Sequence, residues 1–252
     1  MSLPVNPVKR FFYRGITSAA STLTSILLSV YQATLEIEIT GEENLLTEDA
    51  RENNYIIAVW HSFINAALFT FNSRRLLVFT DHPRLESYEK SPAHFFREIG
   101  IKTLRSLGYE VLDASLGKQS AGILNFVKKI RDGFPALIAP DGPDGPIYEA
   151  KPGTIYVASK ANSVILPVGF GFSRKILGRN WDDFSLPLPF SKVTALIGKP
   201  ISVPSKLNET TQKQYTEILE KELDDLSFRA NEIALSGSGD NQGKHNERPE
   251  QN

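Results

Sequence analysis

The sequence predicts a single α/β domain in which helices cover both faces of a mostly parallel sheet. Its 252 residues, 41% of them hydrophobic, suffice for one sizeable core and hardly for two. Short β-rich runs alternate with helical segments, an order that is typical of parallel sheets. The runs 55–60 and 136–139 are apolar on both faces, which indicates strands that are covered on both sides.

The strands of this sheet are expected where β-branched and aromatic residues cluster between turn residues. These runs lie at 35–40, 55–60, 76–80, 109–112, 136–139, 164–170 and 193–198. Helices are expected between them, at 62–71, 91–107, 120–131, 154–161 and 209–233. Because ligands bind at the carboxyl ends of the strands in such sheets, we expect the functional residues there.

Residues 1–34 are expected to form an amphipathic helix that interacts with a membrane. At 3.6 residues per turn, one face is polar and the other largely apolar. The polar face carries Ser18, Thr22, Ser25, Ser29 and Gln32, and the apolar face carries Ile16, Ala20, Leu23, Leu27, Val30 and Tyr31. This pattern, with basic residues just before it, suits a helix lying in a membrane interface. A surface helix that covers the core and a single membrane anchor both remain open.

Residues 35–235 are expected to form the α/β domain, and residues 236–252 a disordered tail. The tail has almost no apolar residue and is rich in Gly, Asn, Gln and charge, so it cannot bury enough surface to become ordered.

The overall charge and the missing cysteine exclude several classes of function. The 28 basic and 29 acidic residues leave a formal net charge of -1, which does not favour a nucleic-acid partner. The chain has no cysteine and therefore no disulfide, thiolate metal site or thiol nucleophile. His82 and His94 lack the companions four residues away that a zinc-binding helix would show, so no metal site is expected.

His61 is the first candidate catalytic residue. It ends the run 55–60 and opens a helical segment, where the positive end of the helix dipole favours a neutral imidazole that can act as a base. The alternative is a histidine that caps the helix or fills a gap in the core. A serine hydrolase that uses the neighbouring Ser62 is not expected, since the chain has no Gly-x-Ser-x-Gly motif.

A doubled Asp-Gly-Pro turn at 141–146 follows the run 136–139. In a parallel sheet this run and 55–60 end at the same edge, so Asp141 and His61 are expected to meet there. Such turns expose backbone N–H groups, and Lys151-Pro-Gly-Thr then begins another helix whose free N–H groups face the same side. The alternative is a rigid turn with no further role.

Several of these segments together resemble the lysophospholipid acyltransferase superfamily, over about residues 35 to 205. They are Trp60-His61, Gly108-Tyr-Glu-Val-Leu and the segments 141–146, 151–154, 165–170 and 181–190. The likeness is greatest to a bacterial-type branch in which Asp-Gly-Pro-x-Gly-Pro replaces Pro-Glu-Gly-Thr. The resemblance implies an enzyme of lipid biosynthesis that transfers a fatty acyl group to the hydroxyl of a lysolipid or lipid precursor.

By this resemblance, His61 would deprotonate the acceptor hydroxyl, which attacks the thioester of acyl-CoA or acyl-carrier protein without a metal or organic cofactor. Asp141 would take the place of the family's Glu beside the histidine. The residues expected to bind substrate are Gly142, Pro143, Gly145, Lys151, Gly153, Thr154 and Arg174. The expected partners are a membrane lipid and the acyl donor, and the expected location is the cytoplasmic face of a membrane.

The sequence departs from the family pattern at two positions. The aspartate that the superfamily places five residues after its histidine is Ala66 here, and Asn65 or, elsewhere in the fold, Asp81 could replace it. The position of the arginine that often binds the acceptor phosphate is occupied by Asp113. Either Arg105, Lys118, Lys151 or Arg174 replaces it, or the acceptor is a lipid without a phosphomonoester. Two alternatives therefore remain open: a catalytically impaired lipid-binding protein on the same fold, and an acyl-thioester hydrolase. The segment 181–190 is interpreted as a structural apolar loop or part of an acyl channel.

Overall fold

The computed structural model describes residues 7–47, 54–80, 92–113, 119–179 and 181–236. Its main sheet has eight strands, in the order β1-β9-β6-β2-β5-β3-β4, with β10 also paired to β6. The strands of this sheet are β1 (Glu36–Thr40), β2 (Tyr55–Ala58), β3 (Leu77–Thr80), β4 (Glu110–Asp113), β5 (Ala136–Ile138), β6 (Val164–Phe172), β9 (Lys192–Ile197) and β10 (Ile201–Ser202). Every run predicted as a strand thus contributes one to this sheet.

The pairing is parallel across most of the sheet, which confirms the predicted fold class. Strands β6, β2, β5, β3 and β4 pair in parallel, as do β1 and β9. Only β9 and β10 run antiparallel to β6 within the described residues. Three described strands were not predicted: β10 in the main sheet, and β7 (Lys175–Leu177) and β8 (Ser185–Pro187), which form a separate antiparallel hairpin.

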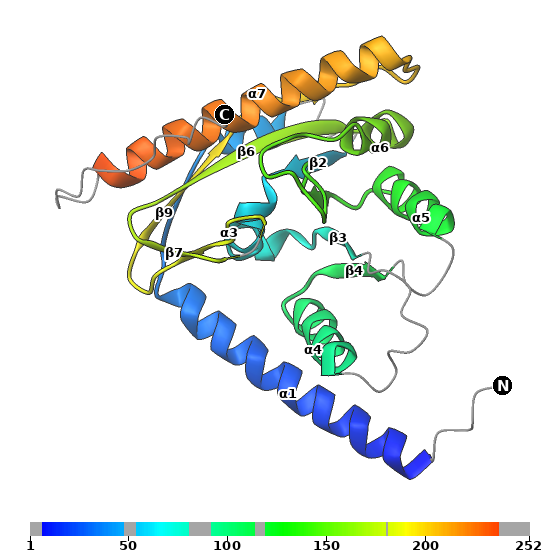
Figure 1. The fold of residues 1–252 in the computed structure, drawn as a ribbon, viewed down its shortest axis with the longest axis vertical. Helices are drawn as coiled ribbons and strands as arrows, with labels where there is room; N and C mark the ends of the chain where they lie inside the picture. Colours follow the sequence, from blue (N-terminus) through cyan, green and yellow to red (C-terminus); the bar gives the residue numbers. More distant parts are fainter. Residues whose placement is uncertain (1–6, 48–53, 81–91, 114–118, 180, 237–252) are drawn as a thin grey trace.

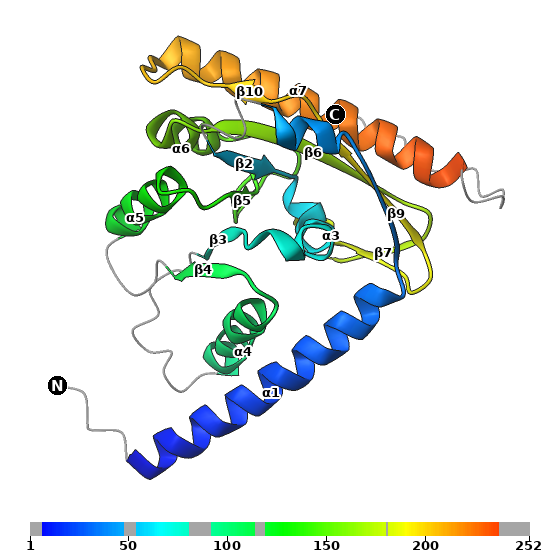
Figure 2. The ribbon, with the colours of Figure 1, turned by 180° about the vertical axis from the view of Figure 1, so that it is seen from behind.

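Helices flank the sheet as predicted. They are α1 (Pro7–Ala33), α3 (Ile64–Thr70), α4 (Pro92–Ser106), α5 (Gln119–Arg131), α6 (Gly153–Ala161) and α7 (Glu209–Ser236), together with the short 3-10 helices η1 (Glu42–Leu46), η2 (His61–Phe63) and η3 (Asn72–Arg74). Helix α7 lies along β6 at one end of the molecule, whereas α1 and α4 pack together at the other end (Figures 1 and 2).

Helix α7 lies unusually close to β6 because two glycines of this strand leave room for the helix backbone. A Cβ atom at Gly169 would lie 2.2 Å from the carbonyl carbon of Leu226, and one at Gly171 would lie 2.0 Å from the carbonyl oxygen of Ala230. All nine residues of β6 are buried. The helix and the strand therefore form one closely packed unit.

Helix α1 packs on α4 through polar side chains. Thr17 is buried and hydrogen-bonds to Glu98 at 3.3 Å, while the Lys102 ammonium donates to Thr17 at 2.5 Å and pairs with Glu98 at 2.9 Å. Ser21 is buried on the same side. The sequence predicted the helix but not that this side would face the domain.

The opposite side of α1 carries an exposed row of apolar side chains, which we call the outer apolar row. Each of its members is more than half exposed: Phe12, Ile16, Leu23, Ile26, Leu27 and Val30. Beyond the helix, Phe190 is 78% exposed, and its N–H donates to the carbonyl of Thr34. No helix in the described ranges combines the length and the hydropathy needed to cross a membrane.

Candidate active site

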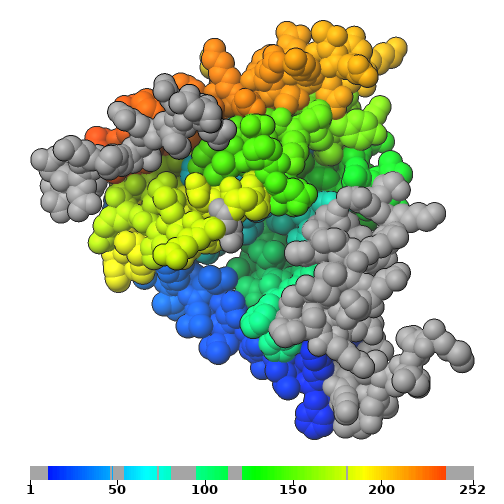
Figure 3. Space-filling model, in the orientation of Figure 1, coloured from blue at the N-terminus to red at the C-terminus, as the bar shows by residue number. Residues whose placement is uncertain are grey.

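His61 lies at the carboxyl edge of the sheet, near its middle. Strand β2 pairs with β6 on one side and β5 on the other, and η2 begins with His61 three residues after β2 ends. The side chain of His61 is 31% exposed, so its ring is accessible from outside while most of it contacts the protein. In Figure 3 the yellow-green hairpin lies above the blue C-terminal half of α1, and the surface is hollowed between them.

The structure places Asp141 directly beside His61. The Asp141 carboxylate is fully buried and accepts the backbone N–H of His61, at 3.0 Å to Oδ1 and 3.3 Å to Oδ2. Burial raises the pKa of Asp141, and the hydrogen bond from the His61 N–H partly opposes this rise. A carboxylate with no exposure cannot reach a substrate, so Asp141 is a positioning residue that fixes the backbone at His61.

Asp141→Asn is expected to change how stability depends on pH. Because the pKa of Asp141 is raised in the folded protein, its contribution to stability is present below the ordinary value of 3.8 and is lost as pH rises through the raised pKa. The variant should therefore gain stability relative to wild type as pH rises across this window. Urea unfolding at a series of pH values measures the difference. Asp144→Asn, which removes an exposed carboxylate from the second turn, is the matched control, and a difference that is constant with pH would contradict the prediction.

Asp182 provides the carboxylate that faces the imidazole. Its Oδ2 lies 2.9 Å from His61 Nδ1, and its side chain is only 8% exposed. Asp182 belongs to the turn between β7 and β8, 121 residues from His61 along the chain. A carboxylate accepts hydrogen bonds, so Nδ1 carries the proton and the lone pair of the neutral ring is on Nε2.

The sequence analysis did not identify Asp182. Ala66, at the position of the superfamily's aspartate, is buried in α3, and Asp81, the predicted replacement, lies outside the described residues. Asp182 was inside the segment interpreted as an apolar loop. The signal that could have found it is the acidic pair Asp182-Asp183 enclosed by Trp181 and Phe184, because an acid within an apolar segment needs a partner.

Ser62 is not placed to act as a nucleophile. It is fully buried, and its hydroxyl donates to the carbonyl of Asp183 at 3.0 Å, with Ser185 Oγ at 3.4 Å. These contacts join η2 to the β7–β8 hairpin. Ser62 therefore helps to hold the hairpin, and with it Asp182, against His61.

The residues predicted to bind substrate lie in different environments. Gly142 is covered by the side chain of Lys151, whose Nζ is 3.4 Å from the position of a Cβ atom on Gly142, while Pro143 is exposed. Gly145 is buried against Trp181. Gly153 and Thr154 begin α6, the first exposed and the second buried.

The candidate phosphate-binding residues likewise lie in different parts of the fold. Arg174 donates to the carbonyls of Pro189 and Phe190, at 3.3 and 2.9 Å, so its guanidinium supports the chain after β8. Arg105 donates to the carbonyl of Val111 at 3.3 Å, beside β4. Lys118 lies outside the described residues. Lys151 covers the turn after Asp141, the residue that accepts the backbone N–H of His61.

Lys175 is a further cation close to η2 that the sequence did not indicate. Its ammonium lies 6.0 Å from the ring centre of Phe63 and 5.5 Å from that of Phe172, both of which are buried. Burial lowers the pKa of Lys175, and the nearby charge of Asp183 opposes this. Lys175 therefore places an ammonium group on the hairpin close to Phe63 of η2.

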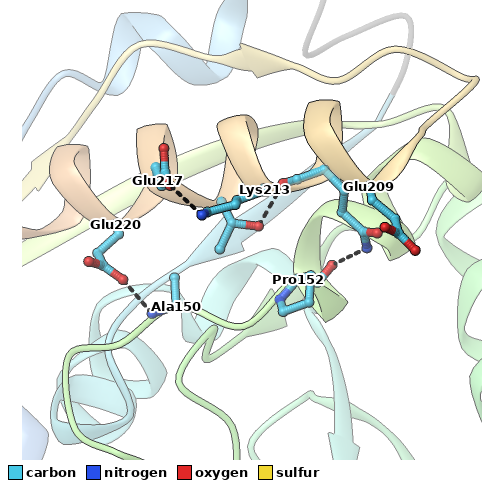
Figure 4. Close-up of a pocket in the computed structure, with 8 residues that line it drawn as sticks. Ala150, Pro152, Glu209, Lys213, Glu217 and Glu220 are labelled. Carbon is cyan, nitrogen blue, oxygen red and sulfur yellow. Dashed lines mark hydrogen bonds and ion pairs between the residues drawn. The ribbon is translucent and has the colours of Figure 1, made fainter.

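A separate groove lies beside the start of α7. It has a volume of about 430 Å³ and separates the start of α7 from the segment that leads into α6 (Figure 4). Glu220 accepts the backbone N–H of Ala150 there at 2.8 Å, and Gln212 donates to the carbonyl of Pro152 at 3.0 Å. Neither His61 nor Asp182 lines it, so this groove is not the site of the paired imidazole and carboxylate.

Comparison with known proteins gives distant matches. No protein-family model matches the chain. The uncharacterised protein RP090 of Rickettsia prowazekii (strain Madrid E) is 25% identical over 228 residues, which cover 85% of this chain and 100% of that protein. Among solved structures, the 1-acyl-sn-glycerophosphate (LPA) acyltransferase PlsC from Thermotoga maritima matches with a TM-score of 0.49 and 14% identity, over 89% of this chain and 84% of that chain. Neither match assigns an activity to this chain.

Proposed function

We propose that this protein is an acyltransferase that moves a fatty acyl group from acyl-CoA or acyl-carrier protein to the hydroxyl of a lysolipid or lipid precursor. The observation that carries the proposal is the pairing of His61 with a buried carboxylate, Asp182. We call these two residues the dyad. A histidine with one nitrogen bound to a carboxylate, and with its side chain partly open to solvent, has the arrangement of a general base.

In the proposed reaction, His61 Nε2 removes the proton from the acceptor hydroxyl while the oxygen attacks the thioester carbonyl carbon. The Asp182 carboxylate stabilises the imidazolium that forms. The tetrahedral intermediate then collapses, the C–S bond breaks, and the imidazolium returns its proton to the leaving thiolate. The thioester is already activated, so a base, proximity and orientation supply the remaining chemistry.

The dyad favours catalysis over simple lipid binding. The strongest sign of lost activity in the sequence was Ala66, where the superfamily resembled has an aspartate. Asp182 instead supplies a carboxylate that contacts the His61 ring, although it comes from a different part of the chain. A buried carboxylate is costly unless it has a role or a strong partner, which supports a functional dyad.

The direct test is incubation of the purified protein with radiolabelled acyl-CoA, or with radiolabelled acyl-carrier protein, and a total lipid extract. Appearance of label in a lipid product supports acyl transfer. Release of labelled free fatty acid without any acceptor would instead identify a thioester hydrolase. Binding of lysolipid with no consumption of either donor would identify a lipid-binding protein, and either of these two results would refute the proposal.

We further propose that the enzyme works at a membrane surface, with α1 lying in the interface. The outer apolar row faces away from the domain, whereas the side of the helix that carries Thr17 and Ser21 is packed on α4. An exposed apolar row of this length is unfavourable in water and suits the boundary between headgroups and acyl chains. Phe190 continues the exposed apolar surface beyond the end of the helix.

Replacing Leu23 and Leu27 together by serine is expected to weaken binding to phospholipid vesicles by about tenfold or more. Each side chain contributes up to about 1.5–3 kcal/mol when it is fully transferred from water, and about 1.4 kcal/mol corresponds to tenfold in binding. Cosedimentation with vesicles measures the change. Ser29→Ala, on an exposed polar position of the same helix, is the control, and unchanged binding by the double variant would argue against an interfacial helix.

A further inference from the structure

The imidazole of His61 is covered on one side by the indole of Trp181. The two ring centres are 5.0 Å apart, and their planes are inclined by 34°. Trp181 immediately precedes Asp182, so one short segment both covers the ring and binds its Nδ1. The orientation of the imidazole therefore depends on where this segment is held.

The Asp182 carboxylate has little else to hold it. Its Oδ2 contacts His61, and its Oδ1 is buried without a hydrogen-bond partner in the described part of the chain. Buried carboxylates are usually fixed by several donors. The position of Asp182 must therefore be maintained largely by the packing of its neighbours, of which Trp181 is the largest.

The indole of Trp181 rests on Gly145, in the second Asp-Gly-Pro turn. A Cβ atom at Gly145 would lie 2.6 Å from Cε3 of Trp181, closer than real Cβ contacts, and 3.0 Å from Cζ3. Gly145 also has φ of +67°, in the left-handed region that favours glycine. Any larger residue at this position would displace the indole.

We propose that Gly145 and Trp181 are positioning residues that orient the His61 imidazole against Asp182, and that this is the role of the second Asp-Gly-Pro turn. The first turn fixes the His61 backbone through Asp141, and the second fixes its ring through Trp181. The consequence of this orientation for catalysis rests on the proposed function, but the orientation itself does not.

The test uses the full chain labelled with ¹⁵N in its histidines, because ¹⁵N chemical shifts distinguish the two neutral imidazole tautomers. In the wild type, the neutral His61 ring should hold its proton on Nδ1, facing Asp182. Trp181→Ala and Gly145→Ala should each populate the form with the proton on Nε2, and Trp181→Phe should restore much of the wild-type state. Gly145→Ala and Trp181→Ala proteins that are folded and keep the wild-type tautomer would overturn the proposal.

A matched control separates the contact with Trp181 from backbone strain. Gly142 has φ of +69°, nearly the same as Gly145, but a Cβ atom there would meet only the flexible Lys151 side chain, at 3.4 Å. Gly142→Ala should therefore introduce similar strain and leave the His61 tautomer unchanged. If Gly142→Ala shifts the tautomer as much as Gly145→Ala does, strain is the cause and the proposal fails.

A double-mutant cycle then tests whether Gly145 acts through Trp181. In the wild-type background, Gly145→Ala should lower kcat by about tenfold to about a hundredfold with little change in KM, the scale of a small misplacement of a catalytic group. In the Trp181→Ala background the same change should lower kcat much less, since the indole that the new Cβ would clash with is gone. Fully additive losses would contradict the proposal. A shifted tautomer in a protein that transfers no acyl group would leave the positioning role intact and refute only the enzymatic function.

Discussion

Asp182→Asn is expected to reduce acyl transfer by about 10⁴ in turnover, while the protein stays folded. The asparagine keeps the size of the side chain but removes its charge, and its amide can hold the imidazole in the wrong tautomer. In serine proteases the same change beside the catalytic histidine costs about 10⁴. The measurement is the initial rate of labelled lipid formation, with unfolding curves to establish that the variant is intact.

Two further variants make this result specific. His61→Ala defines the rate without the base, and Asp182→Asn should approach it. Asp183→Asn changes the adjacent acid, whose side chain is exposed and whose backbone carbonyl still accepts Ser62. This variant should retain most of the wild-type rate. Wild-type turnover in Asp182→Asn would remove the main support for the dyad as the catalytic unit.

Gly171→Ala is expected to destabilise the protein by about 3 kcal/mol or more, at the upper end of what added core volume usually costs. The new Cβ would lie 2.0 Å from the carbonyl oxygen of Ala230, and a helix backbone cannot move aside as a flexible side chain can. Helix α7 would have to shift along its contact with β6. For a domain whose total stability is about 5–15 kcal/mol, this loss is large, and urea unfolding measures it.

Gly100→Ala is the matched control, because Gly100 lies exposed in α4 with no atom within 4 Å of the position of its Cβ. The same chemical change should there stabilise the protein by about 0.5–1 kcal/mol, since alanine favours the helix. Equal effects at Gly100 and Gly171 would show that close packing of α7 on β6 does not limit stability.

The strands and helices of the main sheet could be predicted because their signals are local. The run 164–170 is apolar throughout, and the structure extends it into β6, buried along its whole length. Helix α1 was likewise evident from its periodicity. Periodicity does not reveal which side packs, however, because that depends on Glu98 and Lys102 of a distant helix.

The dyad could be predicted only in part, since its two residues come from distant segments. The carboxyl ends of parallel strands meet at one edge, and this rule was enough to predict that Asp141 lies close to His61. The β7–β8 hairpin lies outside that sheet, and its strands have only three residues each, too few to show an alternating pattern. The position of Asp182 depends on how this hairpin folds back over η2, for which the sequence has no local signal.

The distance between His61 and Asp182 along the chain has a consequence for synthesis. The ribosome releases the histidine early and the carboxylate 121 residues later. Until the hairpin has emerged from the ribosome, the imidazole of His61 has no Asp182 carboxylate to orient it. Chains shorter than 182 residues would lack the carboxylate of the proposed dyad, so the proposed acyl transfer would require synthesis to continue past the hairpin.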